Sequence, residues 1–175
     1  WGPVTHTDRL AAHVLMPGFV EGHAHMMAGK MWYFAYAGYH DRIDPQGQLH
    51  KGMTTIEQVI ARLTDFAAKL PAGQPMLAWG FDPIFLPTER LNRHHLDAVA
   101  TDRPIAVIFS NFHLMCVNSA ALEMAEYGPQ TNAEGVMKDD NGIPNGELQE
   151  MAAMFPVMRR LDIDFRSLSQ GEDAL

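Results

Sequence analysis

The stretch QPMLAWGFD, residues 74–82, decides the fold class. Its apolar run, residues 76–81, is bounded by turn-forming residues, which predicts a strand buried on both faces. PIAVIFSN, residues 104–111, repeats the pattern, and RLNRHHLDAVATD, residues 90–102, predicts a short helix between the two runs. Strands that alternate with helices are typical of an α/β protein with a parallel sheet.

The stretch before this block predicts the clearest helix of the chain. In GMTTIEQVIARLTDFAAKLPAG, residues 52–73, apolar side chains recur at helical spacing. Thr54 and Glu57 have the spacing of a capping box, and Pro71 and Gly73 end the helix.

The second half of the chain predicts two further helices and a turn. VNSAALEMAEYG, residues 117–128, predicts a helix with Asn118 or Ser119 as its N-cap. Residues 138–146, KDDNGIPNG, have turn chemistry, and ELQEMAAMF, residues 147–155, predicts a short helix. Only about three or four strands are predicted, too few to close an eight-stranded barrel of about 250 residues.

The composition argues against several classes of function and structure. The formal net charge of −8 argues against a nucleic-acid-binding surface, which needs a basic footprint. The most apolar aromatic run, residues 31–39, is too short to cross a bilayer. Cys116 is the single cysteine, so an internal disulfide is excluded, and we expect a small buried thiol there.

The stretch MPGFVEGHAHM, residues 16–26, contains a candidate metal-binding pair, His23 and His25. Composition alone predicts roughly half a His-x-His pair in a chain with this many histidines, so the spacing by itself is weak evidence. On a strand, however, residues two apart point to the same face and would offer two imidazoles to one cation. Glu21 shares that face, where we expect a hydrogen-bonded structural carboxylate.

Three ordered stretches of the chain resemble the amidohydrolase superfamily, in its amidohydrolase-3 type, which includes N-substituted formamide deformylases. PGFVEGHAH resembles the family's first barrel strand, with Glu21 where Asp is usual. The block from LAWGFDPIF to FHLMCVNSAAL resembles the family's central motifs, and EGVMKDDNGIPNGELQEMA resembles the stretch that follows them. The resemblance implies part of a metal-dependent (β/α)8 barrel, with residues 1–15 as the remnant of a β-sandwich and residues 16–175 as the first part of the barrel with inserted helices.

The resemblance also implies roles for individual residues. His23 and His25 would be metal ligands, and Glu150 a possible bridging ligand. Glu147, one helical turn earlier, is expected from its position alone to be a carboxylate on a helix surface. His113 would contact substrate or a developing oxyanion. Three residues at the end of the first apolar run would line the substrate side of the site: Trp79, Phe81 and Asp82.

The resemblance implies a metal-dependent hydrolase that cleaves an amide or other non-peptide C–N bond with a metal-activated water. We expect zinc, as one or two ions, and a site completed by residues beyond this chain. Two alternatives stay open: a heterocycle deaminase of the same superfamily, and a non-catalytic module that self-associates. We expect a cytoplasmic protein with a small-molecule substrate, no membrane or nucleic-acid partner, and association with further copies or with the rest of the barrel.

Overall fold

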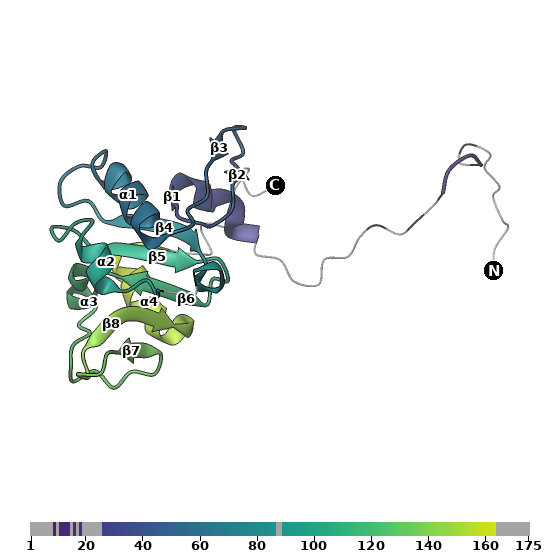
Figure 1. Ribbon diagram of the computed structural model, residues 1–175. Coiled ribbons are helices and arrows are strands. Elements are labelled where there is room, and N and C mark those ends of the chain that lie inside the picture. Colours follow the sequence, from purple (N-terminus) through teal and green to yellow (C-terminus); the bar gives the residue numbers. More distant parts are fainter. Residues whose placement is uncertain are drawn as a thin grey trace, which may run out of the picture.

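A six-stranded sheet lies at the centre of the computed structural model, which describes residues 9, 11–14, 16, 18, 26–86 and 89–163 (Figure 1). Its strand order is β1–β4–β5–β6–β8–β7. The strands are β1 (Ala35–Tyr36), β4 (Met76–Phe81), β5 (Ile105–Phe109), β6 (Leu114–Val117), β7 (Val136–Lys138) and β8 (Pro144–Gln149). A separate hairpin pairs β2 (Arg42–Ile43) with β3 (Leu49–His50).

Helices cover both faces of the sheet. The α-helices are α1 (Ile56–Ala67), α2 (Arg93–Asp97), α3 (Ser119–Met124) and α4 (Glu150–Arg160), and the 3₁₀ helices are η2 (Met26–Tyr33) and η3 (Pro83–Phe85). Both α2 and α4 contact β6 and β8, and Figure 1 shows them on opposite faces of the sheet. Within the described ranges, no helix is long and apolar enough to cross a membrane.

The sheet is mixed, so the prediction of a purely parallel sheet is wrong beyond β5. β1, β4 and β5 are parallel, as expected for strands joined through helices. β5 and β6 are antiparallel, and so are β6 and β8. The reason is local: only a tight turn separates Phe109 from Leu114, and a turn of that length joins antiparallel strands.

Two predictions for the second half of the chain are also wrong. Residues 138–146 are not only a turn, because β8 begins at Pro144 and pairs with β7. Residues 147–149 belong to β8 rather than to a helix, and α4 begins at Glu150 and continues through Pro156. Pairing with β6 compensates for the weak strand propensity of this stretch.

Side-chain caps fix where helices begin. Thr55, one residue after the predicted cap, accepts a hydrogen bond from the amide of Gln58 and starts α1. Asn118 caps α3 and is fully buried. Its Oδ1 accepts from the amides of Ala121 and Ile105, and its Nδ2 donates to two carbonyl oxygens of the preceding loop, those of Ala100 and Arg103. Asn118 therefore ties α3 to the start of β5.

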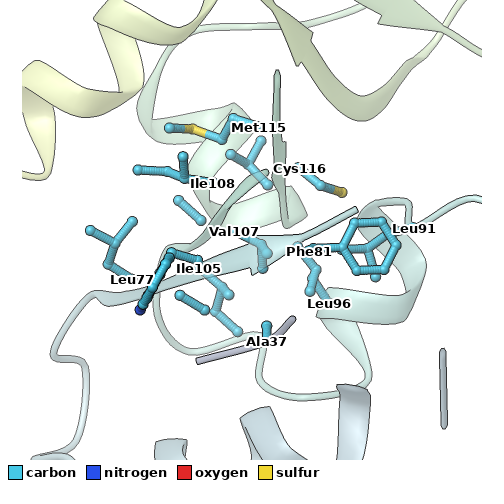
Figure 2. Packing of buried hydrophobic residues seen from close by; sticks show 14 of the residues in the cluster. Ala37, Leu77, Phe81, Leu91, Leu96, Ile105, Val107, Ile108, Met115 and Cys116 are labelled. Carbon is cyan, nitrogen blue, oxygen red and sulfur yellow. The ribbon is translucent and has the colours of Figure 1, made fainter. Parts of the chain in front are cut away.

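The hydrophobic core is built around β4 and β5, the two apolar runs predicted as buried strands. Every residue of β4 and β5 is buried, as predicted for strands covered on both sides. Figure 2 shows Leu91 and Leu96 packing near Phe81 and Cys116 from the α2 side of the sheet. The central strands are therefore held rigidly, and the residues that follow them project from a fixed edge.

Candidate functional site

Four polar side chains gather at one edge of the sheet because of its strand directions. β4, β5 and β8 run the same way, while β6 runs opposite to them. The ends of β4, β5 and β8 therefore share an edge with the start of β6. Asp82, Ser110 and Glu150 each directly follow a strand that ends at that edge, and His113 directly precedes β6.

His113 and Glu150 meet directly at this edge. His113 Nδ1 lies 3.0 Å from Glu150 Oε2, although the residues are 37 positions apart. The backbone repeats the contact, since the Glu150 amide donates to the His113 carbonyl over 2.8 Å. Both side chains are exposed, at 56% for His113 and 71% for Glu150, so the pair faces solvent and any ligand. The structure thus brings together two of the predicted site residues.

The backbone around this pair is strained. Glu150 has φ of 61° and Phe112, which precedes His113, has φ of 60°. Non-glycine residues rarely adopt this left-handed conformation, which costs about 1–2 kcal/mol per residue. Such strain is concentrated at functional sites, where the surrounding structure compensates for it. Here the two strained residues are Glu150 itself and the direct neighbour of His113.

Asp82 and Ser110 form a second contact at the edge, next to the first. Ser110 Oγ donates to Asp82 Oδ2 over 2.8 Å, and Asp82 Oδ1 accepts from the amide of Ile84. The second bond makes Asp82 the N-cap of η3. Asp82 therefore joins the end of β4 to the turn that carries His113. No sequence pattern singles out Ser110, because serine beyond a strand is common in turns.

Trp79 and Phe81 lie within the sheet rather than beyond its edge. Trp79 is 5% exposed and Phe81 1%. Phe81 packs on Phe109, with ring centroids 4.9 Å apart, and Trp79 packs edge-on against Trp32 and Tyr36. Among the described residues these two side chains are core. Their contact with substrate stays a prediction.

Glu147 is a buried partner of Arg90, not the exposed helical carboxylate that was predicted. Its side chain is 4% exposed and accepts two hydrogen bonds from the Arg90 guanidinium and one from Gln149 Nε2. Burial alone would raise the pKa of Glu147, but these hydrogen bonds outweigh it and hold the pKa below its ordinary value. The pair fastens the segment before α2 to β8, close to Glu150.

The predicted metal ligands His23 and His25, with Glu21, lie outside the described residues. Among the residues that the structure does describe, no three or more His, Cys, Asp or Glu side chains form a group able to hold a metal ion. His113 and Glu150 offer an imidazole nitrogen and a carboxylate oxygen, two donor types that suit zinc-like cations. These two atoms could contribute to a ligand set, and the metal-binding role of Glu150 stays a prediction.

Three known proteins are similar to this chain over most of its length. The putative amidohydrolase YtcJ of Bacillus subtilis (strain 168) is 27% identical over 154 residues, covering 86% of this chain and 27% of that protein. The exoenzymes regulatory protein AepA of Pectobacterium carotovorum subsp. carotovorum is 29% identical over 157 residues, covering 82% of this chain and 30% of that protein. The N-substituted formamide deformylase of Arthrobacter pascens is 26% identical over 148 residues, covering 82% of this chain and 26% of that protein. The chain thus spans less than a third of the length of these relatives.

Two solved structures are also similar, both of uncharacterized metal-dependent hydrolases. The protein from Pyrococcus horikoshii OT3 gives a TM-score of 0.48 at 18% identity, covering 85% of this chain and 23% of that one. The protein from Pyrococcus furiosus gives the same TM-score and identity, covering 91% and 27%. The sequence pattern of the Amidohydrolase family, Amidohydro_3, matches residues 10–172. This chain belongs to the amidohydrolase family.

Proposed function

We propose that the protein containing this chain is a metal-dependent hydrolase that cleaves an amide or other non-peptide C–N bond. One observation carries the proposal: His113 and Glu150, from distant segments, meet 3.0 Å apart at the sheet edge of an amidohydrolase-family chain. We further propose that residues 16–175 form the first part of a (β/α)8 barrel, after a β-sandwich remnant at residues 1–15. Catalytic residues of such barrels lie at the carboxyl ends of the strands. Glu150 follows β8 directly, and His113 ends the turn that follows β5.

The contact with Glu150 determines which ring nitrogen of His113 carries the proton. A carboxylate only accepts hydrogen bonds, so the Nδ1 beside Glu150 must carry the hydrogen. In the neutral ring, Nε2 is then unprotonated and presents a lone pair. Nε2 can bind a cation or accept a proton in that state, and it donates to a substrate oxygen only when the ring is charged. Contact with an oxyanion thus requires the imidazolium form of His113.

Glu150 has two tasks that one carboxylate can combine. Its Oε2 accepts from His113 and holds the ring in place, while the second oxygen remains a donor atom for a cation. Carboxylates that orient a histidine in this way are common around metal centres. When bound with His23 and His25, a divalent cation such as zinc would polarise a carbonyl group and lower the pKa of a water.

The test uses the full-length gene product, with its metal content measured by atomic emission. We expect hydrolysis of at least one class among N-acyl amino acids and N-substituted formamides. Glu150→Gln keeps the shape of the side chain but removes its charge, and should lower kcat/KM and metal affinity by about 10- to 100-fold. His23→Ala should lose both activity and metal.

A matched control separates this effect from a general loss of negative charge. Glu123 is an exposed carboxylate on α3, and Glu123→Gln should leave kcat/KM and metal content unchanged. Full activity and metal content in Glu150→Gln would remove Glu150 from the site. Turnover of cyclic amidines with no turnover of any amide would instead assign the protein to the deaminases.

A further inference from the structure

The turn between β5 and β6, residues 110–113, holds His113 next to a residue in an unfavourable backbone conformation. Phe112, which directly precedes His113, has φ of 60°. Its amide donates to the Phe109 carbonyl over 3.0 Å, so Phe112 closes a tight turn. Hairpin turns that end in a left-handed residue favour glycine there, because glycine adopts a positive φ without strain. A phenylalanine at this position requires compensating contacts from its neighbours.

Asn111 supplies one of these contacts. Its Oδ1 accepts a hydrogen bond from the His113 amide over 2.9 Å, so the bond joins the residue before Phe112 to the residue after it. Asparagine side chains commonly accept from the amide two residues further on in turns. The direction of the His113 amide depends on the backbone angles of Phe112. The bond therefore stabilises the left-handed conformation of Phe112 in which it forms.

The two ends of the turn are anchored separately. The Ser110 amide donates to the Phe81 carbonyl over 2.8 Å, which ties the start of the turn to the end of β4. The Glu150 amide donates to the His113 carbonyl, also over 2.8 Å, and ties its other end to the start of α4. Asn111 is exposed and lies between these anchors. Its side-chain bond thus acts on the part of the turn that the anchors leave undetermined.

We propose that Asn111 is a positioning residue, which holds the His113 imidazole in the orientation that meets Glu150. His113 Nδ1 lies 3.0 Å from Glu150 Oε2, and a contact of this kind weakens steeply when its geometry changes. A change in the φ of Phe112 would turn the His113 backbone and carry the ring away from Glu150. The inference rests on the proposed hydrolase function, in which a misplaced His113 would slow the chemical step rather than weaken substrate binding.

The kinetic test uses the metal-loaded full-length protein and an amide that it hydrolyses. Asn111→Ala should lower kcat by about three- to tenfold, the factor that one hydrogen bond contributes to a conformational equilibrium, and leave KM within about twofold. Asn111→Asp keeps the acceptor oxygen and should retain kcat within about twofold. A kcat that Asn111→Ala does not change, or that Asn111→Asp does not restore, would overturn the inference.

A matched control separates positioning from a general loss of turn stability. Asn145, in β8, makes the same type of bond, since its Oδ1 accepts from the amide of Glu147 over 2.8 Å. Asn145→Ala should leave kcat within about twofold. An equal fall of kcat in Asn145→Ala and Asn111→Ala would count against a specific role of Asn111.

Phe112→Gly tests the physical cause, because glycine adopts the left-handed conformation without support. In the Phe112→Gly background, a further Asn111→Ala substitution should lower kcat by less than about twofold. The same loss in both backgrounds would show that Asn111 does not act by compensating for the conformation of Phe112.

A crystal structure of the full-length Asn111→Ala variant distinguishes failure of this inference from failure of the proposed function. The turn should adopt a second conformation, in which φ of Phe112 is negative and His113 Nδ1 lies beyond hydrogen-bond distance of Glu150. An unchanged turn with His113 still in contact with Glu150 overturns the inference alone. If the unmodified enzyme hydrolyses no amide, the proposed function falls, and the structure of the variant still decides whether Asn111 positions His113.

Discussion

Glu147 shows how this fold treats a single buried charge. A carboxylate with 4% of its side chain exposed would normally be costly, yet Arg90 and Gln149 satisfy both of its oxygens. Arg90 remains 57% exposed, so its guanidinium keeps much of its hydration while neutralising Glu147. The ionised form is therefore the stable one, and the pKa of Glu147 lies below its ordinary value.

Glu147→Gln should destabilise the fold at neutral pH by about 1–3 kcal/mol, the range for a disrupted buried polar contact. A carboxylate whose pKa is lower in the folded state stabilises the protein above its unfolded pKa, and this contribution is lost as pH falls through the folded pKa. The difference in free energy of unfolding between wild type and Glu147→Gln should thus be full at pH 7 and shrink below about pH 4. Urea unfolding across this pH range checks it, and a difference independent of pH would contradict it.

At the scale of elements, the contact between β8 and α2 depends on a glycine. Gly146 has φ of 99°, and a Cβ there would lie 2.5 Å from the Val117 carbonyl oxygen and 2.8 Å from the Arg93 amide nitrogen. Both neighbours are backbone atoms, which cannot rotate away. The absence of a side chain lets the start of α2 lie directly on β8, and the Arg90–Glu147 pair then fastens the segment before it.

Gly146→Ala should therefore cost more than backbone strain alone. Gly142 provides the matched control, since its φ is 75° but a Cβ added there would meet no atom within 4 Å. Gly142→Ala should cost about 1 kcal/mol, the strain of a positive φ, and Gly146→Ala at least about 2 kcal/mol more. Thermal or urea unfolding of both variants gives the comparison. Equal losses of stability in the two variants would contradict the close approach of Gly146 to the backbone of Val117 and Arg93.

The sequence predicted those elements whose signal is local. β4, β5 and α1 have long apolar patterns, and the structure confirms them, with the α1 cap shifted to Thr55. β6 and β8 were not predicted, because their strand identity comes from pairing with each other across many intervening residues. For the same reason the position of Glu147 was predicted wrongly. From the segment ELQEM alone, Glu147 has the pattern of an exposed residue on a helix. Its burial depends on pairing with Cys116 in β6 and on the distant Arg90.

The candidate site was predictable only in part. The family resemblance singled out His113 and Glu150, and the structure brings them together. The left-handed backbone at Phe112 had no sequence signal, because φ depends on the turn that the strands impose.

At the scale of the whole molecule, Cys116 reports on the integrity of the sheet. It is fully buried in β6, and burial raises the pKa of its thiol well above the ordinary range. The folded chain should react with a thiol reagent far more slowly than the urea-unfolded chain, by about a hundredfold or more, because reaction requires the core to open. Labelling followed by mass spectrometry measures this rate. Equally fast labelling of both forms would contradict a closed core around β6.

The order of strands along the chain also has a consequence for folding. The turn between β5 and β6 is short, so His113 can reach its position as soon as that hairpin closes. Glu150 arrives only after the chain has passed through α3 and β7 and returned along β6, which closes a much longer loop at greater entropic cost. Assembly of the pair is thus expected to be a late kinetic event. A folding intermediate with an intact β4–β5–β6 core would still lack the site.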